Sequence, residues 1–328
     1  MILMRIIPPN SIVSASFTQN IADLRARATV VAEESVTGQY ADLTKHLGGR
    51  IGDAMIGKKA LTDIEDQRSL LGVRQGRLDL VQKSLAGIQD RVDGLATQML
   101  SAIGTGDYHG QSVVARDAKA ALTDVFTALN GRHGDRFLFS GDETATQPFA
   151  GTEQLLADLR TIAGTATDAA DFETQLDDYF YSATGGWQTS IYRGSSVATD
   201  PDSVTATDPA LVELISGLAI MALSGSEDNL ALFQQNPEIA RSGAERLSSG
   251  TTSLVNLRAD VGIIQERVAK SLETLDTEQT ILNSVYNNMV GRDQYDAASE
   301  LKQLEASLEA AYVLTSRLSN LSLLNFLR

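Results

Sequence analysis

The sequence predicts a mainly α-helical protein. Long antiparallel helical rods, formed by the N- and C-terminal halves, carry a smaller inserted domain of mixed α/β or β-rich structure. Three observations support this fold class: two long seven-residue apolar repeats far apart in the sequence, and a middle that is richer in glycine, threonine and serine. A seven-residue repeat held over many turns is typical of long helices that pack along a narrow seam, not of a compact globule.

The longer repeat lies in the C-terminal half. Its apolar residues recur at every seventh position: Leu247, Leu254, Val261, Val268, Leu275, Leu282 and Met289. As a helix this stretch would span roughly 63 Å, because each residue adds about 1.5 Å. An earlier repeat supplies a partner: Ile64, Leu71, Leu78, Leu85, Val92 and Met99. We therefore expect two coiled-coil-like rods, distant in sequence, to lie side by side.

Helical stripes also flank the rods at both ends of the sequence. Their apolar residues follow alternating spacings of four and three, as on one face of a helix. These stripes give the candidate assembly-interface residues: Phe17, Ile21, Leu24, Val31, Leu304, Leu308, Leu318, Leu321, Leu324 and Phe326. We expect them to have too few partners within one chain, because an exposed apolar end is either covered by a neighbouring molecule or aggregates.

The order of these segments predicts three domains. They are an assembly domain of terminal helices at 1–50 and 290–328, a rod domain at 51–141 and 235–289, and an inserted outer domain at 142–234. Within the insertion, Trp187–Tyr192 follows two glycines and is expected to form a strand after a tight turn.

Composition limits the classes of partner. The net charge of −15 argues against nucleic acid and against anionic membrane surfaces, since both attract basic proteins. Cysteine is absent, which excludes disulfides and thiolate metal sites. No apolar run reaches the roughly 18 residues of a membrane-spanning helix, and the N-terminus lacks the apolar run of a secretory signal. If the protein is secreted, we expect a route without a cleaved signal peptide.

No catalytic, metal or cofactor site is predicted. His46, His109 and His133 lie far apart, whereas a zinc site needs convergent ligands. The segment Asp200-Pro-Asp202-Ser-Val204 begins like a calcium loop, but Val204 occupies a ligand position, so we expect an acidic turn. No nucleophile-elbow spacing is present either.

Two other classes of function remain as less favoured alternatives. A pore-forming translocator would need an apolar hairpin of membrane length, which the sequence lacks. A glycan-cleaving enzyme would need a pair of carboxylates. The sequence does not single out such a pair among the acidic residues of the insertion, which are Asp158, Asp168, Asp171, Glu173, Asp177 and Asp178.

Two stretches carry a resemblance to a known family. One is Arg136-Phe-Leu-Phe-Ser-Gly-Asp-Glu-Thr-Ala-Thr-Gln-Pro-Phe149, and the other is the tail from Tyr295 to Leu327. Together with the symmetric order of the helices, they resemble the flagellin superfamily over about residues 11–150 and 240–328. One departure is Leu47-Gly-Gly-Arg-Ile-Gly-Asp53, which stands where the family usually has a Ser-Arg-Pro-Ser-Asp-Asp-Pro-like segment.

The resemblance implies a secreted, non-enzymatic structural subunit of the bacterial flagellum, exported unfolded by the flagellar type III apparatus. The Phe-Leu-Phe-Ser-Gly segment favours an adaptor at the hook–filament junction over the alternative, flagellin, which is the bulk filament subunit. The implied partners are the inner hook-associated protein, flagellin, further copies of the chain in a ring, and an export chaperone. The terminal helices would form the inner tube of such an assembly.

Overall fold

The computed structural model describes residues 9–225 and 230–326, and the surroundings of the side chains at 15–225 and 230–317. The described chain is mainly α-helical, as the apolar repeats predict, and it divides into two compact units. We call residues 1–68 and 273–328 the terminal unit, and residues 69–272 the bundle unit. The three-domain division expected from the sequence stays a prediction.

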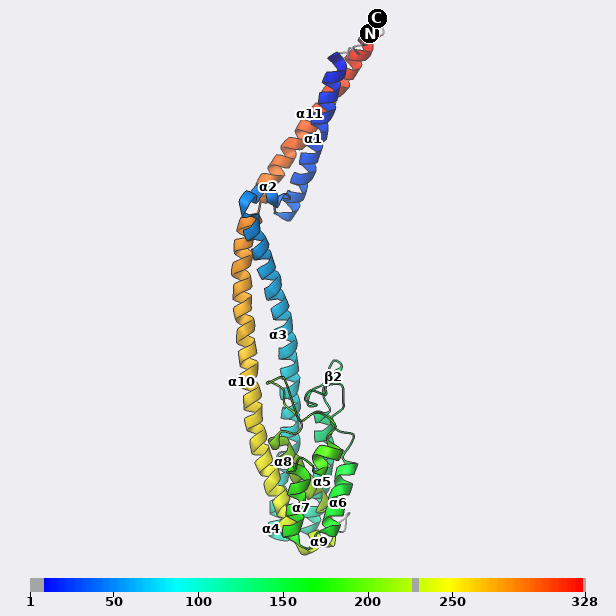
Figure 1. The fold of residues 1–328 in the computed structure, drawn as a ribbon, viewed down its shortest axis with the longest axis vertical. Helices are drawn as coiled ribbons and strands as arrows, with labels where there is room; N and C mark the ends of the chain where they lie inside the picture. The colour runs from blue at the N-terminus through cyan, green and yellow to red at the C-terminus, as the bar shows by residue number, and fades with distance from the viewer. Residues whose placement is uncertain (1–8, 226–229, 327–328) are drawn as a thin grey trace. The chain divides into compact units, whose positions relative to one another are not determined.

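The terminal unit is built around two long helices that pack together. Helix α1 spans Pro9–Thr37 and α11 spans Gln294–Phe326, and the two lie side by side (Figure 1). The unit also holds α2 (Leu43–Leu47), a 3-10 turn (Gly48–Arg50), the start of α3 (Ile51–Val92) and the end of α10 (Pro237–Val290). The pairing of α1 with α11 gives the terminal stripes partners within the chain, which the sequence analysis did not expect.

The bundle unit gathers the remaining elements around one apolar core. Its helices are α4 (Leu95–Thr105), α5 (Tyr108–Leu129), α6 (Glu153–Thr165), α7 (Ala169–Tyr181), α8 (Pro209–Leu223) and α9 (Ala231–Gln235), together with parts of α3 and α10. A short antiparallel hairpin of β1 (Arg132–His133) and β2 (Arg136–Phe137) follows α5.

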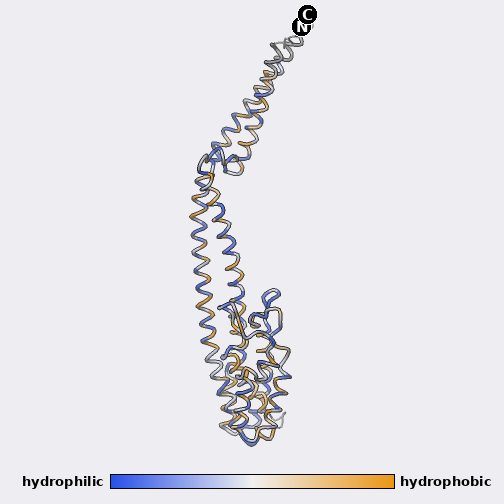
Figure 2. Tube along the Cα trace, viewed as in Figure 1, coloured by the Kyte–Doolittle hydropathy of each residue, from blue (hydrophilic) through white to orange (hydrophobic). Residues whose placement is uncertain are grey.

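The rods pack through their seven-residue repeats, as predicted. Leu78 and Leu85 are fully buried in one core with Leu254, Val261 and Val268. The amide of Gln82 donates to the Arg258 carbonyl at 3.3 Å, and that of Gln265 donates to Asp79 at 2.6 Å, which shows that α3 and α10 run antiparallel. Figure 2 shows hydrophobic and hydrophilic residues alternating along both helices, as expected for a narrow seam.

The N-terminal rod is interrupted within its repeat. Helix α3 ends at Val92 and α4 begins at Leu95, with Gly94 in the left-handed conformation at φ 76°. A glycine adopts this conformation without steric cost, so it ends the helix here. Val92, Leu95 and Met99 are nevertheless all buried. The repeat therefore predicted burial correctly across a break in the helix that it did not reveal.

Helix α8 is the centre of the bundle unit and crosses α10 through glycines. Nearly every residue of α8 is buried. A Cβ on Gly217 would lie 2.4 Å from the Leu247 backbone nitrogen, and one on Gly250 would lie 2.5 Å from that of Leu214. Only glycine permits backbones to approach this closely. The two helices thus cross at a point where side chains are excluded.

The inserted segment is helical, and the expectation of a mixed or β-rich insertion is wrong for its described residues. Between 142 and 234 they contain helices α6, α7, α8 and most of α9, while both strands precede residue 142. Apolar residues at helical spacing explain the difference: Leu155, Leu156, Leu159 and Ala163 in α6, and Phe172, Leu176 and Phe180 in α7, are all buried. Burial of these faces overrides the weak helix propensity of the surrounding threonines and glycines.

The expected strand at Trp187–Tyr192 is also wrong, because residues Trp187–Ile191 form a π-helical turn. The Tyr192 backbone N–H donates to the Trp187 carbonyl at 2.9 Å. Trp187 and Ile191 are both buried, while Thr189 between them is exposed. The turn therefore directs the two large apolar side chains into the core, which an alternating strand would do only by burying Thr189 as well.

Candidate assembly surfaces

The seam between α1 and α11 contains several residues predicted as assembly contacts. Val31, Ala297 and Leu304 form its buried cluster, with Leu24, Ala28 and Leu301 packed against them. Phe17, Ile21 and Leu308 are half-buried. The structure therefore brings Leu24, Val31 and Leu304 together inside one chain. The side chains of Leu318, Leu321, Leu324 and Phe326 lie outside the described residues, although their backbone belongs to α11.

A charged clasp closes the base of this seam. The guanidinium of Arg292, with 13% of its side chain exposed, pairs with Glu34, which is 6% exposed, and with Glu300 at 2.5 Å. Arg27 reaches Glu300 from the other side at 3.3 Å. Arg292 also lies over the ring of Tyr40, 5.5 Å from its centroid. The clasp thus links α1, the segment after it and the start of α11.

Backbone hydrogen bonds complete the clasp. The Arg292 N–H donates to the Gly38 carbonyl at 2.9 Å, and the Tyr40 N–H donates to the Val290 carbonyl at 3.0 Å. Gly38 has φ 67°, a left-handed conformation that favours glycine. The Glu34 carboxylate accepts a further bond from the Ala41 N–H at 2.9 Å. Both connections to the terminal helices are therefore tied together at one point.

The family-like segment 136–149 serves the fold of the bundle unit. Phe139, Ser140 and Phe149 are buried, and the Ser140 hydroxyl donates to the Thr146 carbonyl at 2.6 Å. Gly141 has φ 60°, and a Cβ there would lie 2.2 Å from the Ser195 carbonyl oxygen. The Phe149 N–H donates to Asn130 at 3.0 Å. Within the bundle unit these residues therefore act as a packed turn.

An aromatic cluster covers this turn. Phe149 stacks on Phe126 with ring centroids 4.4 Å apart, and Trp187 lies 5.3 Å from Phe149 and 5.5 Å from Phe180. The Tyr192 hydroxyl lies within hydrogen-bond distance of the Phe139 and Ser195 carbonyls, at 3.1 and 2.9 Å. Burial raises the pKa of Tyr192, so this hydroxyl stays protonated and able to donate at neutral pH.

The acidic turn expected at Asp200–Val204 is held by arginines of α3. Arg77 contacts Asp200 at 2.5 Å, and Arg74 pairs with Asp202, which is buried. These cations neutralise the carboxylates that a calcium ion would need. Among the described residues, no cluster of three or more potential metal-ligating side chains is found.

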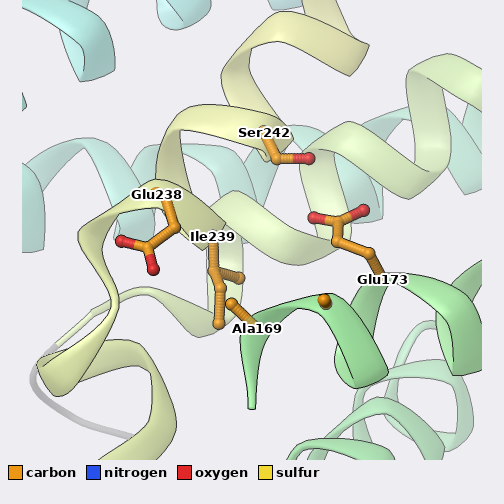
Figure 3. A pocket seen from close by; sticks show the side chains of 6 residues that line it. Ala169, Glu173, Glu238, Ile239 and Ser242 are labelled. Carbon is orange, nitrogen blue, oxygen red and sulfur yellow. The ribbon is translucent and has the colours of Figure 1, made fainter.

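A shallow hollow opens between the N-terminal ends of α7 and α10 (Figure 3). It is lined by Ala169, Ala170, Glu173, Glu238, Ile239 and Ser242. Glu173 and Asp177 also bind Arg246, at 2.7 and 2.8 Å. Burial alone would lower the pKa of Arg246, but the hydrogen bonds from the two carboxylates outweigh it and raise the pKa. Glu173 is thus engaged in an ion pair at the edge of a small open hollow.

No helix among the described residues combines the length and the apolar character needed to cross a bilayer.

Comparisons with known proteins point to one class. Residues 245–327, which contain most of α10 and all of the described part of α11, match the family described as the bacterial flagellin C-terminal helical region. No curated protein matches the chain. Among solved structures, the chain is similar to a protein from Vibrio parahaemolyticus that is described provisionally as a flagellar hook-associated protein. That match has 11% identity and a TM-score of 0.34, and covers 82% of this chain and 95% of the other.

The fold and the sequence match together define a class. The chain is a mainly helical protein with a flagellin-type C-terminal helical region, whose last helix pairs with the first helix of the same chain. Flagellins are structural proteins, so this class is a flagellar structural subunit.

Proposed function

We propose that the protein is an adaptor subunit at the hook–filament junction of the bacterial flagellum, that is, hook-associated protein 3, and that it assembles through its terminal helices. The observation that carries this proposal is the flagellin-type region at residues 245–327, since it includes the helix that pairs with α1. In this role the protein has no catalytic activity.

The proposed partners follow from the position. They are the inner hook-associated protein on one side, flagellin on the other and further copies of the chain within a ring. An export chaperone would hold the unfolded chain before secretion through the type III route, without a cleaved signal peptide. A location outside the cell agrees with the absence of basic, nucleic-acid-binding character in a chain of net charge −15.

The second candidate is flagellin itself, because the C-terminal match does not distinguish a junction protein from a filament subunit. Segment 136–149, with its Phe-Leu-Phe-Ser-Gly sequence, favours the adaptor by resemblance. Immunolocalisation on intact flagella separates the two. We expect a single spot at the distal end of the hook and a trace amount in sheared flagella. Labelling along the whole filament, with the chain as its main component, would establish the flagellin alternative.

A further inference from the structure

Helix α11 has a second apolar face, opposite its seam with α1. Successive residues of an α-helix are rotated by ~100°, so Ala306, Ala310 and Val313 lie on the side opposite Leu304 and Leu308. A shallow hollow on this outer face is lined by Ala306, Glu309, Ala310, Val313, Leu314 and Arg317. Val313 is 47% exposed and Leu314 is 50% exposed.

Two opposite apolar faces are typical of a helix that packs between two partners. Helix α1 of the same chain covers only the inner face, through Val31 and its neighbours. The inner stripe therefore joins the two helices of one chain, and the outer face of α11 is the surface available to a neighbour.

The outer face of α1 is complementary in shape to this hollow. Ala22, Ala26 and Val30 lie opposite its inner stripe, and all three are exposed. Small side chains allow a second helix to approach closely and to receive the larger Val313 and Leu314. Both faces belong to the terminal unit, and both are left uncovered by the pairing of α1 with α11.

We propose that the outer face of α11 docks against the outer face of α1 from a second copy of this chain. The proposal rests on the proposed function, because a ring repeats one head-to-tail contact between identical subunits. Neighbours related by a rotation about an axis along the helices keep the same direction. Since α1 and α11 are antiparallel within one chain, α11 then meets the neighbour's α1 in antiparallel orientation.

The charges at the rims agree with this orientation. When Ala310 is placed against Ala26 of the antiparallel neighbour, the helical rotation brings Glu309 to the side of Arg25. The same alignment brings Arg317 to the side of Asp23. Both pairs are opposite in sign, so they favour this alignment of the two helices over a shifted one.

The absence of natural cysteines allows a direct test by disulfide formation. The full-length chain carrying Ala26→Cys and Ala310→Cys is oxidised in two settings, as concentrated purified protein and within isolated flagella. We expect a ladder of covalent oligomers on a denaturing gel, since both positions face away from the intrachain seam. The matched control carries Ala26→Cys with Ser307→Cys, which lies ~100° away from Ala306 around α11, and should give little ladder.

A second pair of variants keeps the test independent of cross-linking. Ala306→Glu places a charge in the proposed contact and should reduce incorporation into flagella on the order of tenfold or more, while the helix content of the monomer stays unchanged. Ser307→Glu should incorporate normally.

The outcomes separate the inference from the function. Normal incorporation of Ala306→Glu, or a ladder equal to that of the control, would overturn the docking. A protein found in flagella that gives no ladder would overturn it too, and would leave the proposed function standing. A specific ladder in purified protein that is absent from flagella would keep the docking and reject the function.

Discussion

The bundle unit and the terminal unit are stabilised in different ways. In the bundle unit, helices from six segments surround α8, and large side chains such as Phe149, Trp187 and Leu85 are fully buried. In the terminal unit, the seam between α1 and α11 buries only Val31, Ala297 and Leu304 among its described residues. A buried arginine and two glutamates close its base. The comparison teaches that the bundle unit completes its own core, whereas the terminal unit leaves apolar faces for neighbours.

The largest effect is expected from removing an aromatic ring of the bundle core. Phe149→Ala should lower the free energy of unfolding of the bundle unit by about 3–5 kcal/mol, because it leaves a cavity among Phe126, Trp187 and Tyr192. Trp187 is the single tryptophan, so its fluorescence during urea unfolding reports on this unit alone. The control Tyr108→Ala, at a residue 80% exposed, should change little. Equal stability of Phe149→Ala and the natural protein would contradict the central place of this cluster.

A change in the clasp should act on the terminal unit instead. Arg292→Met leaves the buried Glu34 without its cation and should cost about 3 kcal/mol, at the low end for a broken buried pair because Glu300 remains partly solvated. Hydrogen exchange of α1 and α11 measures this loss, and tryptophan fluorescence should show an unchanged bundle unit. The exposed Arg27→Met is the matched control. If both variants exchanged alike, the clasp would contribute no more than a surface pair.

A smaller effect is expected in the seam. Leu304→Ala should weaken the pairing of α1 with α11 by about 2 kcal/mol, the lower limit for a buried leucine, because a two-helix contact surrounds it less completely than a full core does. Limited proteolysis at rising temperature measures the change. Leu314→Ala, on the outer face of the same helix, should leave the monomer unaffected. Equal sensitivity of the two variants would remove the distinction between inner and outer faces.

The smallest effect concerns a carboxylate at the start of α8. Burial raises the pKa of Asp208 above its usual 3.8, although the Ala210 N–H opposes the shift. A raised folded pKa means that stability is fully present below the unfolded pKa and is lost as pH rises through the folded value. Asp208→Asn keeps the cap and removes the titration.

The stability of the natural protein relative to Asp208→Asn should therefore fall as pH rises from below 3.8. Urea unfolding across this range measures the difference, with the exposed Asp135→Asn as control. A difference that stays constant with pH would show that Asp208 is not desolvated in the folded state.

The sequence by itself determined the features that depend on local spacing. The seven-residue repeats predicted that Leu78, Leu85, Val261 and Val268 are buried, and the four-three stripes predicted the helices at both ends. These predictions succeed because the side-chain period of a helix is written directly in the order of residues. Apolar residues on a second face of α11, including Ala306, Ala310 and Val313, were also present in the sequence. Their meaning depended on knowing which face α1 covers.

Only the tertiary structure decided which surfaces meet. Gly217 and Gly250 look like helix breakers in the sequence, but they allow α8 and α10 to approach closely. Trp187 follows two glycines, yet the surrounding core selects a π-helical turn in place of a strand. Arg292 and Glu34 are far apart in the chain and carry no pattern that links them. Contacts between distant residues arise from the packing of whole elements, so no local period reveals them.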